Sequence, residues 1–384
     1  MGIYSEYIDR KMTFQEITDE RKLQLRRISE LRENRDILVY ASDLTKNNAP
    51  ISIDYNDILP FSDQLANLKG TKIDIILETP GGLAEIVEDL VKLVRGKYES
   101  VGIIVPGSSK SAGTIFAMAG DEILMGKNSA LGPIDAQIVT NGKRFSADAF
   151  LEGLKKIKEE IESTKKLNPA YIPMLQNISP GEIQHCENAQ DFSQKLVSEW
   201  LVKYKFKYWQ KHKSTGKTVT LEEKTIRAKE IAKILCDHSF WLTHSRSIKI
   251  EDFDNMKLLI TDYSLNDELD DAITKYYTLL RMSFDSNNLY KIFETCESQI
   301  YKIISTPISS NVKKDAGIAE INIQCSRCKS GYSIQANVGK KAQIKKGNIP
   351  FPKNNVFVCP KCKTEHNLLQ ARMDIENQTG LKIL

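Results

Sequence analysis

The stretch Gly107-Ser108-Ser109-Lys110-Ser111-Ala112-Gly113-Thr114 decides how this sequence is interpreted. An apolar run at residues 103–105 precedes it, and a second apolar run with helical character follows at residues 115–119. A serine with small neighbours, placed between a strand and a helix, is typical of a nucleophile on a sharp turn. Ser111 is therefore the candidate nucleophile.

A second turn signal, Thr79-Pro80-Gly81-Gly82, lies one strand–helix unit earlier, after an apolar run at residues 73–77. Tandem strand–turn–helix units place both turns at the carboxyl edge of one parallel sheet, where open α/β sheets carry their sites. A serine nucleophile needs a base, and its tetrahedral intermediate needs N–H donors. Gly81 or Gly82 could supply one donor, because a glycine backbone can approach a substrate closely. The N–H of Ala112, at a helix N-terminus, could supply the other. This pairing suits acyl transfer.

Ser111 has a simpler interpretation as well. Serine is a favoured helix N-cap, and the triplet Ser111-Ala112-Gly113 alone would fit a cap. The order and spacing of the two turns within one alternating α/β unit favour the catalytic interpretation.

Strands and helices alternate along the first third of the chain. Strands are expected at residues 37–40, 73–77, 102–105 and 123–125, and helices at 83–95 and 111–119. This alternation predicts an α/β fold with a parallel sheet and right-handed crossovers.

Helices are also expected in the remainder of the main part of the chain. A charged helix is predicted at 13–35, a helical extension at 147–168, 181–211 and 221–236, and mostly helix at 251–305. The expected division is an N-terminal helical segment at 1–35, a main domain at 36–305, a linker at 306–320 and a small β domain with a tail at 321–384.

Composition sets the broad class of protein. The chain has 384 residues, 41% hydrophobic and 27% charged, which is ordinary for a soluble globular protein. No apolar run approaches the ~20 residues of a membrane span. The N-terminal residues lack a basic stretch leading into an apolar core, so we expect a cytoplasmic protein. The net charge of +4 is too small, taken alone, to imply nucleic acid.

Two cysteine pairs predict a metal site. Cys325-Ser326-Arg327-Cys328 and Cys359-Pro360-Lys361-Cys362 have the spacing in which one turn presents two sulfurs. Four thiolates, Cys325, Cys328, Cys359 and Cys362, would bind Zn²⁺ tetrahedrally, and the β-prone segment between the pairs predicts a zinc ribbon. Such a closed site is structural, because it leaves no open position for a substrate.

The predicted ribbon is basic. Between Cys325 and His366 its lysines and arginines face only Glu365 as an opposing charge. A basic surface with interleaved aromatic residues could hold a nucleic-acid backbone. A protein-docking module, or a solvated face around a negatively charged zinc site, is favoured over nucleic acid.

Several blocks in this sequence resemble the serine dehydrogenase proteinase family, which belongs to the Clp-protease/crotonase superfamily and is related to signal peptide peptidase A. They are Leu77-Glu78-Thr79-Pro80-Gly81-Gly82, Ile104-Val105-Pro106, Ser111-Ala112-Gly113-Thr114, residues 119–125 and residues 129–137, with a weaker match at 241–248. The resemblance covers roughly the first two-thirds of the chain. It implies a Clp/crotonase-like sheet, Ser111 as nucleophile, the Gly81/Gly82 turn as part of the oxyanion hole, and a homo-oligomer.

The resemblance leaves the base open. Where the Clp proteolytic subunit has its histidine, this chain has Asp135, and His244 lies close to where the Clp aspartate would be. His244 is the first choice, because a histidine can act as a base at neutral pH without much tuning. Asp135 could orient it. The other histidines with a claim, His238 and His185, have no motif and are interpreted as structural.

A serine–lysine dyad, as in signal peptide peptidases, would instead draw its base from Lys155, Lys156 or Lys158. A lysine base needs a pKa lowered by burial. These three lie in a charged helix with Glu152, Glu159 and Glu160, which favours a solvated face.

The sequence thus predicts a serine endopeptidase that acts on polypeptide substrates and carries a structural zinc ribbon. One alternative is a catalytically silent adaptor of the same fold whose basic ribbon binds protein or nucleic acid. A second alternative is crotonase-like chemistry on an acyl-thioester, which would share the oxyanion hole but need no serine nucleophile.

Overall fold

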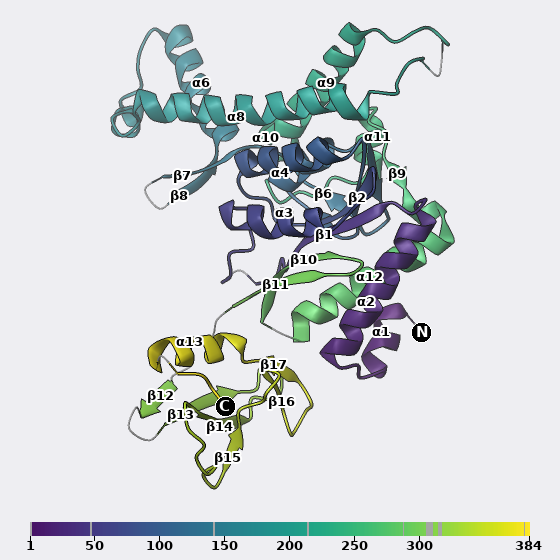
Figure 1. Cartoon of the computed structure of the whole chain (residues 1–384). Helices are drawn as coiled ribbons and strands as arrows, with labels where there is room; N and C mark the ends of the chain where they lie inside the picture. Colours follow the sequence, from purple (N-terminus) through teal and green to yellow (C-terminus); the bar gives the residue numbers. More distant parts are fainter. Residues whose placement is uncertain are drawn as a thin grey trace. The chain divides into compact units, whose positions relative to one another are not determined.

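The computed structural model describes residues 2–46, 48–140, 143–212, 215–286, 288–304, 310–313, 317–379 and 381–384 (Figure 1). The chain divides into two compact units. The larger comprises Leu25–Ile273 and Ile292–Ile300, and the smaller comprises Met1–Gln24, Thr274–Lys291 and Tyr301–Leu384. The linker predicted at 306–320 lies partly outside the described residues.

A seven-stranded sheet in the order β11-β10-β1-β2-β3-β5-β9 organises the larger unit. Its strands are β1 (Asp36–Ser42), β2 (Lys72–Glu78), β3 (Ser100–Val105), β5 (Glu122–Met125), β9 (Thr261–Asp262), β10 (Leu289–Thr295) and β11 (Gln299–Ile303). From β1 through β2, β3 and β5 to β9, every neighbouring pair is parallel. The predicted α/β class with a parallel sheet is confirmed.

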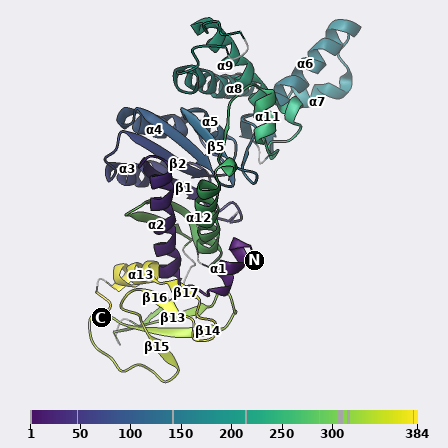
Figure 2. The ribbon, with the colours of Figure 1, turned by 90° about the vertical axis from the view of Figure 1, so that its right-hand side faces the viewer.

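The crossovers between these strands are the helices α3 (Ile58–Ala66), α4 (Ala84–Lys97) and α5 (Ala112–Met118). Helix α4 contacts both α3 and α5, and the three can be followed beside the sheet in Figure 2. Helix α4 buries one apolar face at positions spaced three and four apart, from Ile86 to Val94. Burying each such side chain contributes about 1.5–3 kcal/mol. Arg95 and Lys97 in its last turn complement the helix dipole.

A helical extension follows the sheet strands. It contains α6 (Ala147–Thr164), η2 (Pro169–Tyr171), α7 (Ile172–Leu175), α8 (Pro180–Trp200), the π-helical η3 (Leu201–Lys205), α9 (Leu221–Cys236), α10 (His238–Trp241) and α11 (Ile250–Asn255). Helix α8 begins with a capping box between Ser179 and Glu182 and contacts α5, α6 and α9. This unit also contains the short elements η1 (Tyr55–Asp57) and η4 (Tyr263–Leu265) and an antiparallel pair of strands, β7 (Gln137–Thr140) and β8 (Lys143–Ser146).

The prediction of mostly helix over residues 251–305 is wrong at its end. Helix α12 (Asp267–Ser286) is present, but β10 and β11 follow it and extend the sheet beyond β1. Ile292 and Phe293 of β10 are buried, because the strand lies inside the sheet between β11 and β1. Tertiary pairing outweighs local propensity here.

The smaller unit contains α1 (Ile3–Asp9), the start of α2 (Phe14–Leu31) and most of α12, with Tyr7, Ile17, Leu279 and Met282 forming one apolar cluster. Its C-terminal part is a four-stranded sheet, a hairpin and a helix. These are β12 (Ser310–Lys313), β13 (Ile318–Gln324), β14 (Gly331–Asn337), β15 (Asn348–Pro350), β16 (Val356–Val358), β17 (Glu365–Asn367) and α13 (Leu369–Thr379). Ile321, Ile334 and Phe357 belong to a separate core in this part.

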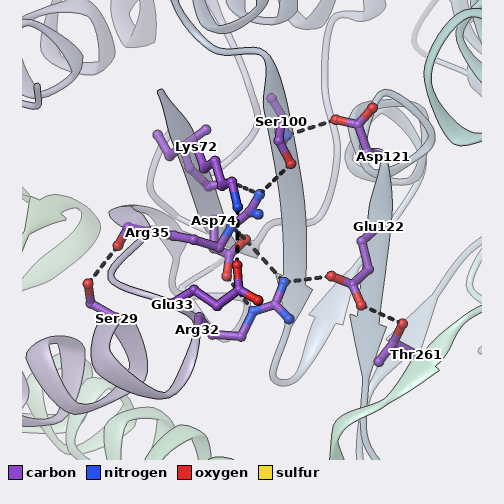
Figure 3. A network of polar contacts seen from close by, with 12 residues as sticks. Ser29, Arg32, Glu33, Arg35, Lys72, Asp74, Ser100, Asp121, Glu122 and Thr261 are labelled. Atoms are coloured by element: carbon purple, nitrogen blue, oxygen red, sulfur yellow. Dashed lines mark hydrogen bonds and ion pairs between the residues drawn. The ribbon is translucent and has the colours of Figure 1, made fainter. Parts of the chain in front are cut away.

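A charged network closes the amino edge of the main sheet (Figure 3). Asp74 of β2 is fully buried, and its two carboxylate oxygens lie 2.7 Å from Nε of Arg32 and 2.6 Å from Nε of Arg35. Arg32 also reaches Glu122 at 2.6 Å. Gly102 of β3 makes room for the carboxylate, since a Cβ there would lie 2.2 Å from Asp74 Oδ1. The network is at the opposite ends of the strands from the predicted site.

Among the helices of the described residues, none combines the length and the apolar character that crossing a membrane requires.

Candidate active site

Short strand pairings bring the two sequence turns together at the carboxyl edge of the sheet. Strand β4 (Ser108–Ser109) pairs in parallel with β6 (Ala130–Leu131), and Thr79 forms an isolated parallel bridge with Ser109. The Thr79 amide donates to the Ser108 carbonyl at 3.0 Å, and the Lys110 amide donates to the Thr79 carbonyl at 2.9 Å. The Pro-Gly-Gly turn is therefore held directly beside the chain that leads into Ser111.

Ser111 occupies a strained backbone conformation. Its φ of 51° and ψ of −120° lie where side-chain-bearing residues are rarely found, at a cost of about 1–3 kcal/mol. It stands immediately before α5 but makes no side-chain cap hydrogen bond. Within the described part of the chain its hydroxyl has no hydrogen-bond partner, and the side chain is half-buried. The helix-cap interpretation of Ser111 therefore does not apply.

The glycines of the first turn permit a close approach to this serine. Gly81 has a φ of 101°, and a Cβ there would lie 2.6 Å from Ser111 Cβ and 3.1 Å from the Ala112 nitrogen. Gly82 has a φ of 151°, and a Cβ there would lie 2.3 Å from the Ile53 carbonyl oxygen. Neither position tolerates a side chain without moving the backbone.

Two amides near Ser111 donate to no group within the described part of the chain. The Gly81 amide donates to Thr79 Oγ1 at 3.2 Å, and its carbonyl accepts from Ile53 at 2.7 Å. The amides of Gly82 and Ala112, by contrast, donate to no group among the residues that the structure describes. Of the three donors expected from the sequence, Gly82 and Ala112 thus remain available to an incoming oxyanion, and Gly81 shapes the turn.

Asp135 and His244, more than a hundred residues apart in the sequence, lie side by side. Asp135 Oδ1 is 2.6 Å from Nδ1 of His244, and Oδ2 is 2.9 Å from Nδ1 of His238. Gln137 donates to Oδ2 at 2.9 Å. Burial alone would raise the pKa of Asp135, but hydrogen bonds from His244, His238 and Ser146 outweigh it and lower the pKa. Asp135 is therefore a buried carboxylate that binds two imidazoles.

This arrangement fixes the tautomer of His244. An imidazole that donates Nδ1–H to a carboxylate keeps the lone pair of Nε2 free to accept a proton. No hydrogen bond joins His244 to Ser111 among the described residues, and hydrogen bonds of this kind are often long in ligand-free enzymes. The sequence missed the role of His238 as a partner of Asp135, although it lies only six positions before His244. His185 lies exposed on α8.

The alternative lysines lie on the solvent face of α6. The side chains of Lys155, Lys156 and Lys158 are 63%, 70% and 76% exposed and approach glutamates of the same helix at 3.9–4.0 Å. The desolvation that makes a lysine a base at neutral pH is missing there.

A second site lies in the C-terminal part of the smaller unit. The sulfurs of Cys325, Cys328, Cys359 and Cys362 all lie within 4.8 Å of one another, and none is in a disulfide. The Cys325–Cys362 and Cys328–Cys359 sulfurs are 3.5 and 3.6 Å apart. Four sulfurs at ~2.3 Å from one tetrahedral ion would be about 3.8 Å apart. The cluster is compatible with a metal site.

Hydrogen bonds favour the thiolate form of Cys359, whereas burial raises the pKa of Cys325 to about 11. Burial would raise the pKa of Cys359, but the Tyr332 hydroxyl and the amides of Cys362 and Lys361 outweigh it and lower the pKa to about 6. Amides that bond the first sulfur of a knuckle in this way are suited to a metal-bound thiolate.

Comparison with known proteins bears on the region around Ser111. Residues 7–189, a little under half of the chain, match the family described as ClpP-like SDH-type serine proteinases. That region is similar to this family. The resemblance predicted from the sequence is thereby confirmed over residues 7–189, which contain Ser111, the Gly81/Gly82 turn and Asp135, whereas the weaker block at 241–248 lies outside the match. The matched region does not contain His244 or the four cysteines.

Two uncharacterised proteins of Methanocaldococcus jannaschii are also similar to this chain. One is 34% identical over 88 residues, which is 23% of this chain and 30% of that protein. The other is 39% identical over 70 residues, which is 18% of this chain and 24% of that protein. The matches thus span less than a third of either relative.

A solved structure of a mutant of the 1510-N membrane-bound stomatin-specific protease is 20% identical and covers 47% of this chain and 80% of its own, with a TM-score of 0.23. This likeness is too slight to bear on the site.

Proposed function

We propose that this protein is a serine endopeptidase in which Ser111 attacks the scissile carbonyl of a polypeptide. The observation that carries the proposal is the backbone of Ser111, which has a positive φ. Among the residues that the structure describes, its hydroxyl and the amides of Gly82 and Ala112 have no hydrogen-bond partner. Strain of this kind persists only where the surrounding structure enforces it, and it clusters at active sites. The match to a serine proteinase family agrees with this assignment.

In the proposed mechanism His244 takes the proton from the Ser111 hydroxyl and returns it to the leaving amine. Asp135 holds the imidazole through Nδ1 and stabilises the imidazolium that forms. The amides of Gly82 and Ala112 bind the oxyanion, and the N-terminus of α5 favours the same negative charge. Losing one such donor costs about 3–4 kcal/mol of barrier.

The test is a Ser111→Ala variant compared with Ser108→Ala, a serine three positions earlier on β4. A fluorophosphonate should label the wild type and Ser108→Ala, but not Ser111→Ala, and peptide or ester hydrolysis should follow the label. Full hydrolysis by Ser111→Ala would overturn the proposal. Absence of labelling in the wild type would favour the silent adaptor, and thioesterase-like activity that survives in Ser111→Ala would favour crotonase-like chemistry.

The base is tested separately with His244→Gln, which should suppress hydrolysis at pH 7. A lysine-based mechanism would survive this change. The matched control is His185→Gln, which replaces an exposed histidine on α8.

For the four cysteines we propose structural Zn²⁺, which favours tetrahedral thiolate ligation. Cys325, Cys328, Cys359 and Cys362 would hold it, and the ion would stabilise the fold of the ribbon. Metal analysis should find about one zinc per chain. A Cys359→Ser variant should lose the metal and the ribbon structure but keep reactivity of Ser111, whereas a metal-free wild type with a folded ribbon would contradict the proposal.

Three further properties remain predictions. We expect a cytoplasmic protein, since four reduced thiols suit that compartment. We also expect a homo-oligomer, and a monomer at all concentrations in light scattering would contradict this expectation. Binding of nucleic acid by the basic ribbon is not favoured, and a salt-dependent shift with single-stranded RNA or DNA would reverse that preference.

A further inference from the structure

The lysine immediately before the proposed nucleophile makes three polar contacts with other segments. Lys110 Nζ donates to the Leu131 carbonyl, the Arg246 carbonyl and the Ser247 hydroxyl, each at 3.0 Å. An ammonium has three N–H donors, so these contacts use them all. Leu131 belongs to β6, while Arg246 and Ser247 belong to the segment that carries His244, which we call the His244 loop (residues 242–248).

The fold leaves space for the Lys110 side chain to reach these acceptors. A Cβ at Gly132 would lie 2.6 Å from Lys110 Cδ, so the absence of a side chain at this position lets the lysine pass. Burial, together with the nearby charge of Lys249, lowers the pKa of Lys110 to about 8. Holding a partly buried ammonium in this place therefore has a cost, which its three acceptors offset.

The same loop is also attached to β6 through Ile248, its last residue. Leu131 and Ile248 form an antiparallel bridge, with hydrogen bonds of 3.1 and 2.9 Å between their amides and carbonyls. Lys249 Nζ adds a hydrogen bond of 2.7 Å to the Ser129 carbonyl. Asp135 binds the loop through His244 itself. Of these attachments, only Lys110 joins the loop to the residue next to Ser111.

We infer that Lys110 is a positioning residue that holds the His244 loop in register with the turn that carries Ser111. The inference rests on the proposed function, because it gives the lysine a role in aligning base and nucleophile. Lys110 is not itself the base in this scheme. Its three protons are directed at two carbonyls and a hydroxyl, which leaves no lone pair to accept the proton of Ser111.

The test compares Lys110→Met with Lys97→Met. Lys97 is the matched control because its ammonium also donates to backbone carbonyls, those of Leu65 and Leu68 at 2.7 and 2.6 Å, and these lie away from the site. Removing Lys110 should lower kcat about 10²-fold, as expected for a misplaced catalytic group, while KM stays unchanged. It should also accelerate hydrogen exchange at the amides of residues 243–248. Lys97→Met should do neither, even where it lowers thermal stability equally.

Lys110→Arg distinguishes positioning from base catalysis. Arginine retains the donors and cannot accept a proton, so it should recover part of the kcat that methionine loses. An arginine variant as inactive as the methionine variant would overturn the positioning role, as would unchanged exchange or unchanged kcat in Lys110→Met. Failure of the proposed function is recognised separately, because the wild type itself would then neither hydrolyse nor take the fluorophosphonate label, and the positioning role would fall with it.

Discussion

Replacement of Asp135 by asparagine tests the core of the proposed mechanism with almost no change in shape. The carboxylate accepts from the Nδ1 atoms of two histidines, at 2.6 Å from His244 and 2.9 Å from His238. An asparagine has one accepting oxygen, and its amide nitrogen can only donate. One of the two imidazoles must therefore face a donor, and it must either lose its bond or change tautomer.

The expected magnitude follows from these two outcomes. If the asparagine oxygen faces His244, the tautomer survives but a charge-assisted bond worth about 1.5–3 kcal/mol is weakened, which corresponds to roughly 10–10²-fold in kcat. If the amide faces His244, Nε2 carries the proton and cannot accept another, and a loss of about 10⁴-fold is expected. We expect Asp135→Asn to lie between these limits.

The assay is the rate of fluorophosphonate labelling of Ser111 together with kcat on a peptide or ester substrate. His238→Gln is the matched control, since it removes the second imidazole and leaves the bond between Asp135 and His244. It should cost only about fivefold, the value of one ordinary hydrogen bond. An Asp135→Asn protein that is folded and as active as the wild type would refute the assignment of His244 and Asp135.

Three other predictions concern a glycine beside Ser111, the buried Asp74 network and the pH dependence of stability. Gly82→Ala should lower kcat by about 10²–10³-fold, because its Cβ would meet the Ile53 carbonyl and displace an oxyanion donor. An unchanged kcat would show that Gly82 is not part of the oxyanion hole. Asp74→Ala should lower the free energy of unfolding in urea by about 3–5 kcal/mol, because the buried Arg35 would lose its carboxylate partner and Arg32 would keep only Glu122. A loss near zero would show that water solvates the two guanidinium groups. The pKa of Asp135 is lowered in the folded state, so its stabilisation is complete above the unfolded pKa of about 3.9 and disappears as the pH falls through the lower folded value. Below about pH 4, the free energy of unfolding of Asp135→Asn should therefore change less steeply with pH than that of the wild type. Equal slopes for the two proteins would contradict this.

The sequence predicted the parallel sheet and the nucleophile turn because both are local patterns. Apolar runs identify β2 and β3, and the small residues around Ser111 mark the turn between β3 and α5. The Pro-Gly-Gly turn after β2 is a local pattern as well, and the family resemblance implied the same role for it in an oxyanion hole. Contacts between distant segments were harder to foresee. Nothing local indicated that His238 would share Asp135 with His244, or that the side chain of Lys110 would reach residues 246 and 247.

Strands β10 and β11 illustrate the same limit. They follow the long helix α12, and their residues do not by themselves distinguish a strand from a continuation of the helical pattern. Their pairing depends on the edge that β1 offers, which lies far away in the sequence. A short signal such as Cys-x-x-Cys is different, because the spacing itself dictates the turn, and the four cysteines do come together.

The clearance at the glycines around Ser111 has a consequence for deep mutational scanning. A Cβ at Gly82, Gly113 or Gly132 would meet the Ile53 backbone, the Ser109 hydroxyl at 2.3 Å or the Lys110 side chain, respectively. A library that substitutes every position would therefore score these glycines as intolerant as the serine they surround. Fitness data alone would therefore identify the residues around Ser111 but would not say which of them performs chemistry. A probe that reacts with the Ser111 hydroxyl makes that distinction.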